Sequence, residues 1–269
     1  VIGVGEATLA HIKKVMSAIG IDEGDFMRCC DGTFKNAIRF DNFRAKGETF
    51  WHPFTQLSHV NDFAMINLWL AARRDGYTGS YAEAVAQDPA MCERFLAPKR
   101  ASDAPYDGLV NYAYHIDTIK LGRYLRDLGK QRGVHHVVDL VTDTGRDEAG
   151  NITHVHTEEH GDIAGDLFID CSGFRALLLN QVLEEPFRSF SDVLFNDNAV
   201  AMRVPNPEGQ RDIRPFTTCS AQEAGWIWNI PLHQRTGVGH VYSSAHIDKD
   251  AAEQALRDYV GPANEGLEA

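Results

Sequence analysis

The sequence predicts a mixed α/β fold, of either the α/β or the α+β class, and three observations lead to it. Residues 117–134 place leucines at helical spacing behind Asp117, a suitable N-cap. Residues 225–231, GWIWNIP, alternate large apolar side chains with the period of a strand. Helical and strand-like segments interleave along 269 residues, a length that suffices for one large domain or two smaller ones.

The first half of the chain begins with a predicted strand in VIGVG, followed by an amphipathic helix at 12–19. Residues 34–43 alternate as a strand does. A helix is expected at 60–76, and a helical stretch that breaks near Pro89 is expected at 80–97.

The second half carries further strands and two more helices. The sequence DEAGN at 147–151 predicts a hairpin turn. Helices are expected at 174–183 and from Asp248 onward. The strands are expected at 134–143, 151–160, 165–174, 198–205, 225–232 and 237–246.

Composition narrows the class of protein. The formal net charge is −12, and no run of Lys or Arg would track a nucleic acid. No apolar run reaches the length of a membrane span, and the five cysteines have no metal-type spacing. We therefore expect a cytoplasmic protein with reduced thiols and with neither a membrane nor a nucleic-acid partner. Because the chain starts inside a predicted strand and stops just after a helix, we also expect a fragment of a longer protein.

Two glycine-containing segments are candidates for binding a nucleotide. In GVGEAT, at 3–8, glycines between a strand and a helix would bring backbone N–H groups toward an anion. Thr8 replaces the third glycine of the dinucleotide fingerprint, so an ordinary tight turn is the alternative. In GDLFIDCSGF, an apolar strand runs into Asp170 and Gly173, as at the ligand-binding edge of a nucleotide-binding sheet. A core strand followed by a solvated turn is the alternative there.

Lys35 and the FWHPF segment at 50–54 are candidates for chemistry on an aromatic substrate. A lysine among apolar neighbours can be desolvated and become a better acid or nucleophile. Spacing alone favours a solvated face that Lys35 would share with Arg39 and Asp41. The aromatics around His52 indicate either an aromatic pocket or simple core packing.

The histidines at 154 and 156 share one face of a predicted strand, but their surroundings indicate a solvated hairpin, so no metal site is expected. Hydrolase and nucleotide-hydrolysing motifs are missing from the sequence.

The tryptophan strand predicts two different faces. Trp226, Trp228 and Ile230 would face one side, with Ile227 and Asn229 on the other. Pro231 cannot donate to a ladder, so the strand should end there or lie at an edge.

Taken together, these motifs resemble the flavin-dependent tryptophan halogenase family. The order VGEAT, FKNAIRF, HPF, AYHID, DLFIDCSGFRALL, EEPF and GWIWNIPL matches over essentially the whole chain. The last motif contains the family signature W-x-W-x-I-P, here Trp226, Trp228, Ile230 and Pro231.

The resemblance implies an FAD-binding core like that of the flavin monooxygenases, with an added β-sheet layer on the substrate side. It implies one truncated domain, with flavin-side segments at 1–34 and 115–180 and substrate-side segments at 35–114 and 181–269. It also implies a separate NAD(P)H-dependent flavin reductase that delivers FADH2. Reaction with O2 and chloride or bromide would yield hypohalous acid, which halogenates an electron-rich aromatic such as tryptophan or another indole.

The resemblance assigns roles residue by residue. Lys35 matches the catalytic lysine, and His52 and Phe54 match the pair that lines the substrate pocket. The signature tryptophans would lie near the flavin. The residues implied to contact the flavin are Gly3, Gly5, Glu6, Ala7, Thr8, Asp170, Gly173 and Phe174.

The sequence also departs from the family pattern. The glycine-rich opening strand of the family would lie before Val1, and its catalytic glutamate would lie after Ala269. The alternatives are a flavin-dependent aromatic hydroxylase and a non-catalytic remnant that binds flavin or an aromatic compound.

Overall fold

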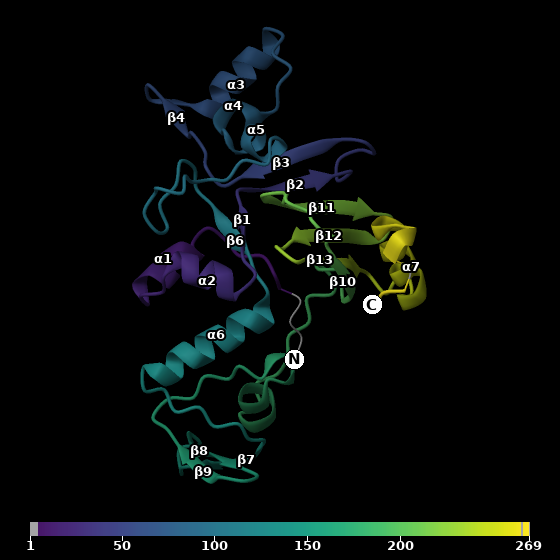
Figure 1. The fold of residues 1–269 in the computed structure, drawn as a ribbon. Coiled ribbons are helices and arrows are strands. Elements are labelled where there is room, and N and C mark those ends of the chain that lie inside the picture. The colour runs from purple at the N-terminus through teal and green to yellow at the C-terminus, as the bar shows by residue number, and fades with distance from the viewer. Residues whose placement is uncertain (1–4, 265, 269) are drawn as a thin grey trace. The chain divides into compact units, whose positions relative to one another are not determined.

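The computed structural model describes residues 5–264 and 266–268, and the chain divides into two compact units (Figure 1). The first unit contains the chain up to Asp127 and again from Leu194, and the second runs from Leu128 to Val193. Helices and strands occur in both, which confirms the mixed α/β class. The predicted opening strand and Gly3 lie largely outside the described residues.

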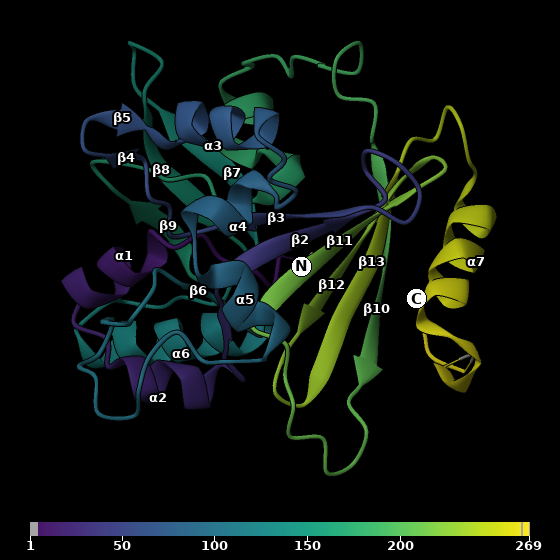
Figure 2. The ribbon, with the colours of Figure 1, turned by 90° about the horizontal axis from the view of Figure 1, so that it is seen from above.

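A six-stranded sheet forms the centre of the first unit (Figure 2). Every neighbouring pair in it is antiparallel except β2 and β11, which are parallel. The sheet therefore joins strands from the early and the late parts of the chain. Its strands, in spatial order, are β10 (Asn198–Pro205), β13 (Arg235–Tyr242), β12 (Gly225–Pro231), β11 (Phe216–Gln222), β2 (Ala37–Asp41) and β3 (Thr49–Pro53).

The two predicted faces of the tryptophan strand are confirmed. On one face, Ile227 is fully buried and packs with Ala252 and Leu256 of α7 (Lys249–Val260), the helix beside β10 and β13 in Figure 2. On the other face, Trp228 and Ile230 form a second apolar cluster that includes Trp226. As predicted, β12 ends at Pro231, and Asp248 caps α7 by accepting a hydrogen bond from the Ala251 N–H at 2.8 Å.

The strand expected at 34–43 is in fact two strands. Thr33–Lys35 form β1, which pairs with β6 (Ala113–His115), whereas β2 joins the large sheet. The chain leaves the first ladder at Asn36, whose N–H donates to the Pro215 carbonyl at 2.7 Å. Two helices precede this point, α1 (Ile12–Ala18) and α2 (Glu23–Cys29).

Short elements connect β3 to β6. The helix expected at 60–76 begins only at Met65, because positive φ angles at Asn61 and Asp62 close a hairpin first. The predicted break near Pro89 is confirmed, since this proline lies in the first turn of α5. The elements are β4 (His59–Val60), β5 (Phe63–Ala64), α3 (Met65–Arg74), α4 (Tyr81–Val85) and α5 (Asp88–Glu93).

The predicted helix at 117–134 is α6 (Thr118–Gln131), which crosses from the first unit into the second. Asp117 caps it as predicted, because Oδ1 accepts from the N–H groups of Ile119 and Lys120 at 3.0 and 2.9 Å. None of the helices in the described part of the chain is long and apolar enough to cross a membrane.

The second unit is built on a three-stranded antiparallel sheet of β7 (Val141–Arg146), β8 (Ile152–Thr157) and β9 (Gly161–Ala164). The predicted hairpin turn is confirmed, with the Asp147 carboxylate accepting from two backbone N–H groups at 2.8 and 2.9 Å. The strand expected from 134 begins only at Val141.

The prediction of a strand at 165–174 is wrong. Leu167 and Ile169 are 79% and 78% exposed, and no strand among the described residues pairs with this segment. A strand needs such a partner to satisfy its backbone. The helix expected at 174–183 is instead a 3₁₀ turn, η1 (Gly173–Arg175), and a π-helix, η2 (Leu177–Val182).

Close approach of Trp228 to β13 generates a first prediction. A Cβ atom at Gly239 would lie 2.1 Å from the Trp228 ring, so Gly239→Ala should destabilise the protein by about 1–3 kcal/mol through overpacking. Urea unfolding measures the change. Gly122→Ala in α6 is the control, because a Cβ there meets nothing within 4 Å and should stabilise the helix by about 0.5–1 kcal/mol. Equal stability of the two variants would contradict the predicted close packing.

Candidate functional site

Lys35 is buried at the end of β1, with only 4% of its surface exposed. Its ammonium Nζ donates to the Thr8 carbonyl at 3.2 Å and lies 5.4 Å from the centre of the Phe54 ring. The structure thus brings together three residues that the sequence analysis singled out separately. The alternative of a solvated face shared with Arg39 and Asp41 is wrong for Lys35.

Burial changes the acidity of this lysine. Desolvation lowers the pKa of Lys35 from its usual 10.5 to about 8, and Cys219 opposes the shift only in part. At neutral pH the ammonium predominates and can donate a hydrogen bond. One pH unit higher, half or more of the lysine is the neutral amine, which is a nucleophile.

His115 is fully buried on β6, beside β1, and was given no role from the sequence. Its Nδ1 lies 3.2 Å from the Thr33 hydroxyl, and its Nε2 lies 2.9 Å from the Thr217 hydroxyl. The Thr33 hydroxyl donates to the Pro231 carbonyl at 2.7 Å, so it accepts from Nδ1–H of His115. Burial, assisted by the charge of Lys35, holds the pKa of His115 well below its usual range.

The only sequence signal for His115 is the motif AYHID, in which it follows Tyr114 and stands two residues before the N-cap Asp117. Its hydrogen bonds tie β6 and β1 to β11 and to the end of the tryptophan strand. A neutral imidazole at this place adds no positive charge beside Lys35.

The tryptophan signature packs behind the segment at residues 5–8. Trp228 is 9% exposed and belongs to a cluster with Ile230 and the partly buried Trp226 and Ala7. The two indole rings meet edge to face with centroids 6.3 Å apart. Because Ala7 precedes Thr8, whose carbonyl holds Lys35, this cluster supports the lysine indirectly.

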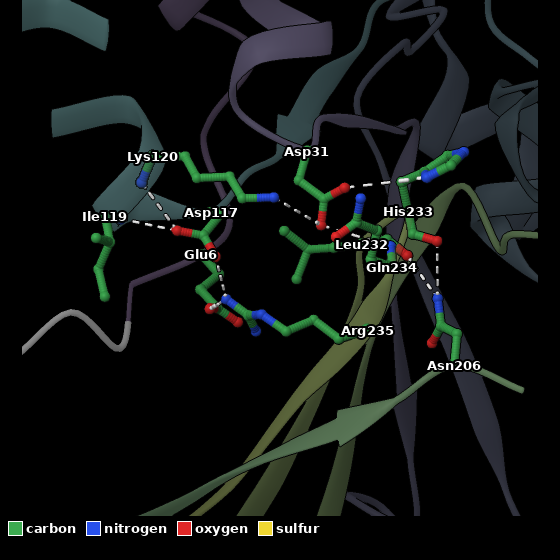
Figure 3. A network of polar contacts seen from close by, with 10 residues as sticks. All are labelled: Glu6, Asp31, Asp117, Ile119, Lys120, Asn206, Leu232, His233, Gln234 and Arg235. Carbon is green, nitrogen blue, oxygen red and sulfur yellow. Dashed lines mark hydrogen bonds and ion pairs between the residues drawn. The ribbon is translucent and has the colours of Figure 1, made fainter. Parts of the chain in front are cut away.

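An ion-pair network anchors the same segment from another side (Figure 3). Nη2 of Arg235 donates to the carboxylates of Glu6 and of Asp117, the latter at 2.8 Å. Hydrogen bonds lower the pKa of Asp117 against the opposing effect of burial, and the two carboxylates raise that of Arg235. A Cβ atom at Gly237 would collide with the Glu6 carboxylate, so any other residue there would displace that carboxylate.

Neighbouring groups in Figure 3 hold the turn at residues 232–235. Asp31 faces the Lys120 ammonium at 3.9 Å and the His233 ring at 4.0 Å, and it also accepts from the Gln234 N–H at 3.4 Å. The Asn206 amide donates to the carbonyls of Leu232 and His233 at 2.9 and 3.1 Å.

At residues 5–8, the exposed backbone of Gly5 suits a flavin better than the side chains do. Part of the remaining backbone is already paired, since the Thr8 N–H donates to the Tyr114 carbonyl at 2.9 Å and the Glu6 carbonyl accepts from the Ile116 N–H at 2.8 Å. Glu6 is committed to Arg235, and the Thr8 hydroxyl donates to the Tyr114 carbonyl at 3.0 Å and accepts from the Tyr114 N–H at 2.9 Å. Gly5 is exposed, and Nη1 of Arg235 is buried without a hydrogen-bond partner among the described residues. The exposed backbone at Gly5 and this unused donor suit a ligand with acceptor atoms.

His52 lies in β3, and Phe54 directly follows the end of the strand. Their rings meet at right angles with centroids 6.2 Å apart. His52 also borders a cavity of about 550 Å³ between β3 and the helices that follow, where Trp69 and Tyr81 are among the lining residues. Phe54 thus stands between Lys35 and His52.

Asp170, Gly173 and Phe174 belong to the second unit. Hydrogen bonds from the Ser172 hydroxyl and backbone, together with two helical N–H groups, hold the pKa of Asp170 at about 2. Gly173 has a φ of +69°, and Phe174 is 96% exposed. The Asp170 carboxylate organises this loop, which leaves the turn and the exposed ring available to a ligand.

His154 and His156, on one strand of the second unit, lie close to the same carboxylate. Asp162 lies 3.6 Å from His154 and 2.6 Å from His156. Within the described part of the chain, no three His, Cys, Asp or Glu residues form a group that could hold a metal ion.

The buried lysine generates a pH prediction. Because the folded pKa of Lys35 is about 8 and the usual value is 10.5, the unfolded chain binds this proton more tightly. The wild type should therefore gain stability, relative to Lys35→Met, as the pH rises from 8 to 10.5, by up to about 3 kcal/mol. Urea unfolding of both proteins across this range measures the difference. A difference that stays constant with pH would contradict the shift.

Comparison with known proteins places the chain in a family. A family model described as tryptophan halogenase matches residues 1–267. The 7-chloro-L-tryptophan 6-halogenase KtzR of Kutzneria sp. (strain 744) is 41% identical, over 100% of this chain and 55% of that protein. The tryptophan 6-halogenase SttH of Streptomyces toxytricini is 39% identical with the same coverage, 100% and 55%.

The solved structures agree. Tar14, a tryptophan C-6 flavin-dependent halogenase (chlorinase) from taromycin biosynthesis, matches with a TM-score of 0.93 and 42% identity, over 100% of this chain and 54% of that one. The chain spans about half the length of the curated relatives it matches. Since the family model covers nearly every residue and the fold matches throughout, the resemblance is confirmed, and the chain belongs to the tryptophan halogenase family.

Proposed function

We propose that the whole protein is a flavin-dependent halogenase that uses FADH2, O2 and chloride or bromide to halogenate tryptophan or a similar indole. The observation that carries the proposal is the buried Lys35, whose pKa of about 8 leaves it a strong hydrogen-bond donor beside an aromatic ring. Relatives named as tryptophan halogenases support the substrate class.

Lys35 would act on hypohalous acid. When bound, reduced flavin supplies the electrons with which O2 and halide become this oxidant. The Lys35 ammonium would donate a hydrogen bond to its oxygen, so that the halogen turns toward the ring. As the carbon–halogen bond forms, the oxygen–halogen bond breaks, the oxygen leaves as water and the ring loses one proton. Burial of Lys35 keeps bulk water from competing for its hydrogen bond.

Other residues would bind and orient. We assign the substrate side to His52 and Phe54, and the flavin to the segment at residues 5–8. In the second unit we assign the turn at Asp170 and Gly173, with the exposed Phe174, to the flavin. These assignments retain the flavin-side segments 1–34 and 115–180 and the substrate-side segments 35–114 and 181–269. A separate flavin reductase is the proposed partner.

The decisive test is mass spectrometry of a reaction with the protein expressed from its complete reading frame. The mixture contains a flavin reductase, FAD, NADH, air, bromide and tryptophan. We expect a product with the bromine isotope doublet, and we expect Lys35→Ala to lower its rate of formation at least about a hundredfold. Lys13→Ala is the matched control, since the Lys13 ammonium lies over a different ring, 3.9 Å from the centre of Tyr112. A product that gains one oxygen would instead identify a hydroxylase, and full activity of Lys35→Ala would refute the catalytic assignment.

The signature tryptophans should shape the site rather than transfer a proton or halogen. Trp228→Ala should lower the free energy of unfolding by about 3–5 kcal/mol, because Trp228 is 9% exposed. Trp226→Ala should have a smaller effect, because that side chain is less buried. Both variants should retain more halogenation, measured below their unfolding midpoints, than Lys35→Ala does. A loss as complete as that of Lys35→Ala would contradict a shaping role.

A further inference from the structure

We propose that Asp88 is a positioning residue that fixes the Phe54 ring beside Lys35, and so sets which carbon of the aromatic substrate faces the lysine. The inference rests on the proposed function and adds a determinant of regioselectivity outside the motifs of the family. Asp88 itself is the first residue of α5 and is fully buried.

The need for this residue arises where β3 stops. Pro53 is the last residue of β3, so the N–H groups of Phe54 and Thr55 have no ladder partner. Oδ1 of Asp88 accepts both of them, at 3.2 and 3.1 Å. The carboxylate therefore replaces a neighbouring strand at the residue that carries the ring.

The opposite side of the same backbone is also held. The Asn111 side-chain amide donates to the Phe54 carbonyl at 3.3 Å, and the Asn111 N–H donates to the Thr55 hydroxyl at 2.5 Å. Because both its N–H and its carbonyl are hydrogen-bonded, the backbone of Phe54 has little freedom to move. Its ring stays between the Lys35 ammonium at 5.4 Å and the His52 ring at 6.2 Å.

Burying this carboxylate is unfavourable by itself. Oδ2 of Asp88 is buried without a hydrogen-bond partner among the described residues, and burial raises the pKa of Asp88. Such a group destabilises a fold unless its contacts compensate. Its Oδ1 accepts from the backbone of Phe54 and Thr55. These contacts assign Asp88 a role in placing the Phe54 ring.

The experiment compares Asp88→Ala, Asp88→Asn and Asn111→Ala with the wild type, each expressed from the complete reading frame. Asp88→Asn keeps an oxygen that can accept the Phe54 N–H. Asn111 is exposed, so its variant should fold even if Asp88→Ala does not. Asp248→Ala, which removes the cap of α7, is the control for a general loss of stability.

Three quantities are measured: the ratio of monobrominated tryptophan isomers, the affinity for tryptophan by calorimetry, and hydrogen exchange of the peptide that contains Phe54 and Thr55. In Asp88→Ala we expect exchange to be at least about tenfold faster, because the N–H groups of Phe54 and Thr55 lose their hydrogen bonds to the carboxylate. Asp88→Ala and Asn111→Ala should bind tryptophan more weakly and shift the isomer ratio. Asp88→Asn and Asp248→Ala should keep the wild-type ratio.

The outcomes separate the two proposals. If the wild type brominates tryptophan but neither Asp88→Ala nor Asn111→Ala changes the isomer ratio or the affinity, Asp88 is only structural and this inference is overturned. If Asp248→Ala shifts the ratio equally, the inference is also overturned. If the wild type forms no brominated product while Asp88→Ala still weakens tryptophan binding, the proposed function fails and the positioning of Phe54 stands.

Discussion

The parallel pairing of β2 with β11 is the contact on which the candidate site depends. It aligns Ala37–Asp41 with Phe216–Ser220 and joins the early strands β2 and β3 to four strands from late in the chain. On its two sides, antiparallel ladders attach β3 and the tryptophan strand. Parallel strands require a long connection, and here residues 42–215 lie between the two strands. Lys35, Phe54 and the tryptophan signature therefore reach one another only in the completed sheet.

Buried hydrogen bonds then fix the short ribbon of β1 and β6 to that sheet. Thr33 bonds to Pro231, His115 bonds to Thr217, and the N–H of Asn36 bonds to Pro215. Each such group would cost about 1–3 kcal/mol if it were left unpaired in the interior. These bonds confine β1, and with it Lys35. The Lys35 ammonium donates to the Thr8 carbonyl, and burial removes it from water. The same confinement that lowers the pKa of the lysine also holds it beside Phe54.

The polar side chains of the proposed flavin segments are engaged in contacts within the protein. The side chains of Glu6, Thr8 and Asp170 form hydrogen bonds with Arg235, with β6 and within a local loop, respectively. The Thr8 N–H also pairs with β6, so the exposed Gly5 and the turn at Gly173 are what these segments leave accessible. The tryptophan signature supports residues 5–8 from behind through Ala7, and glycines on β13 make room for Trp228 and Glu6. The site therefore requires both the space that these glycines leave and the hydrogen bonds that these side chains make.

The sequence alone determined the features that depend on neighbours along the chain. The two faces of the tryptophan strand, the cap at Asp117, the break at Pro89 and the turn at 147–151 all follow from spacing, capping and turn chemistry. Motif order also sufficed to identify the family.

Only the tertiary structure decided the burial of Lys35, the role of His115 and the clamp at Asp88, because each depends on residues distant in the chain. The strand predicted at 165–174 failed for the same reason. Its apolar residues favour a strand, but a strand exists only where another backbone pairs with it, and periodicity carries no record of that partner.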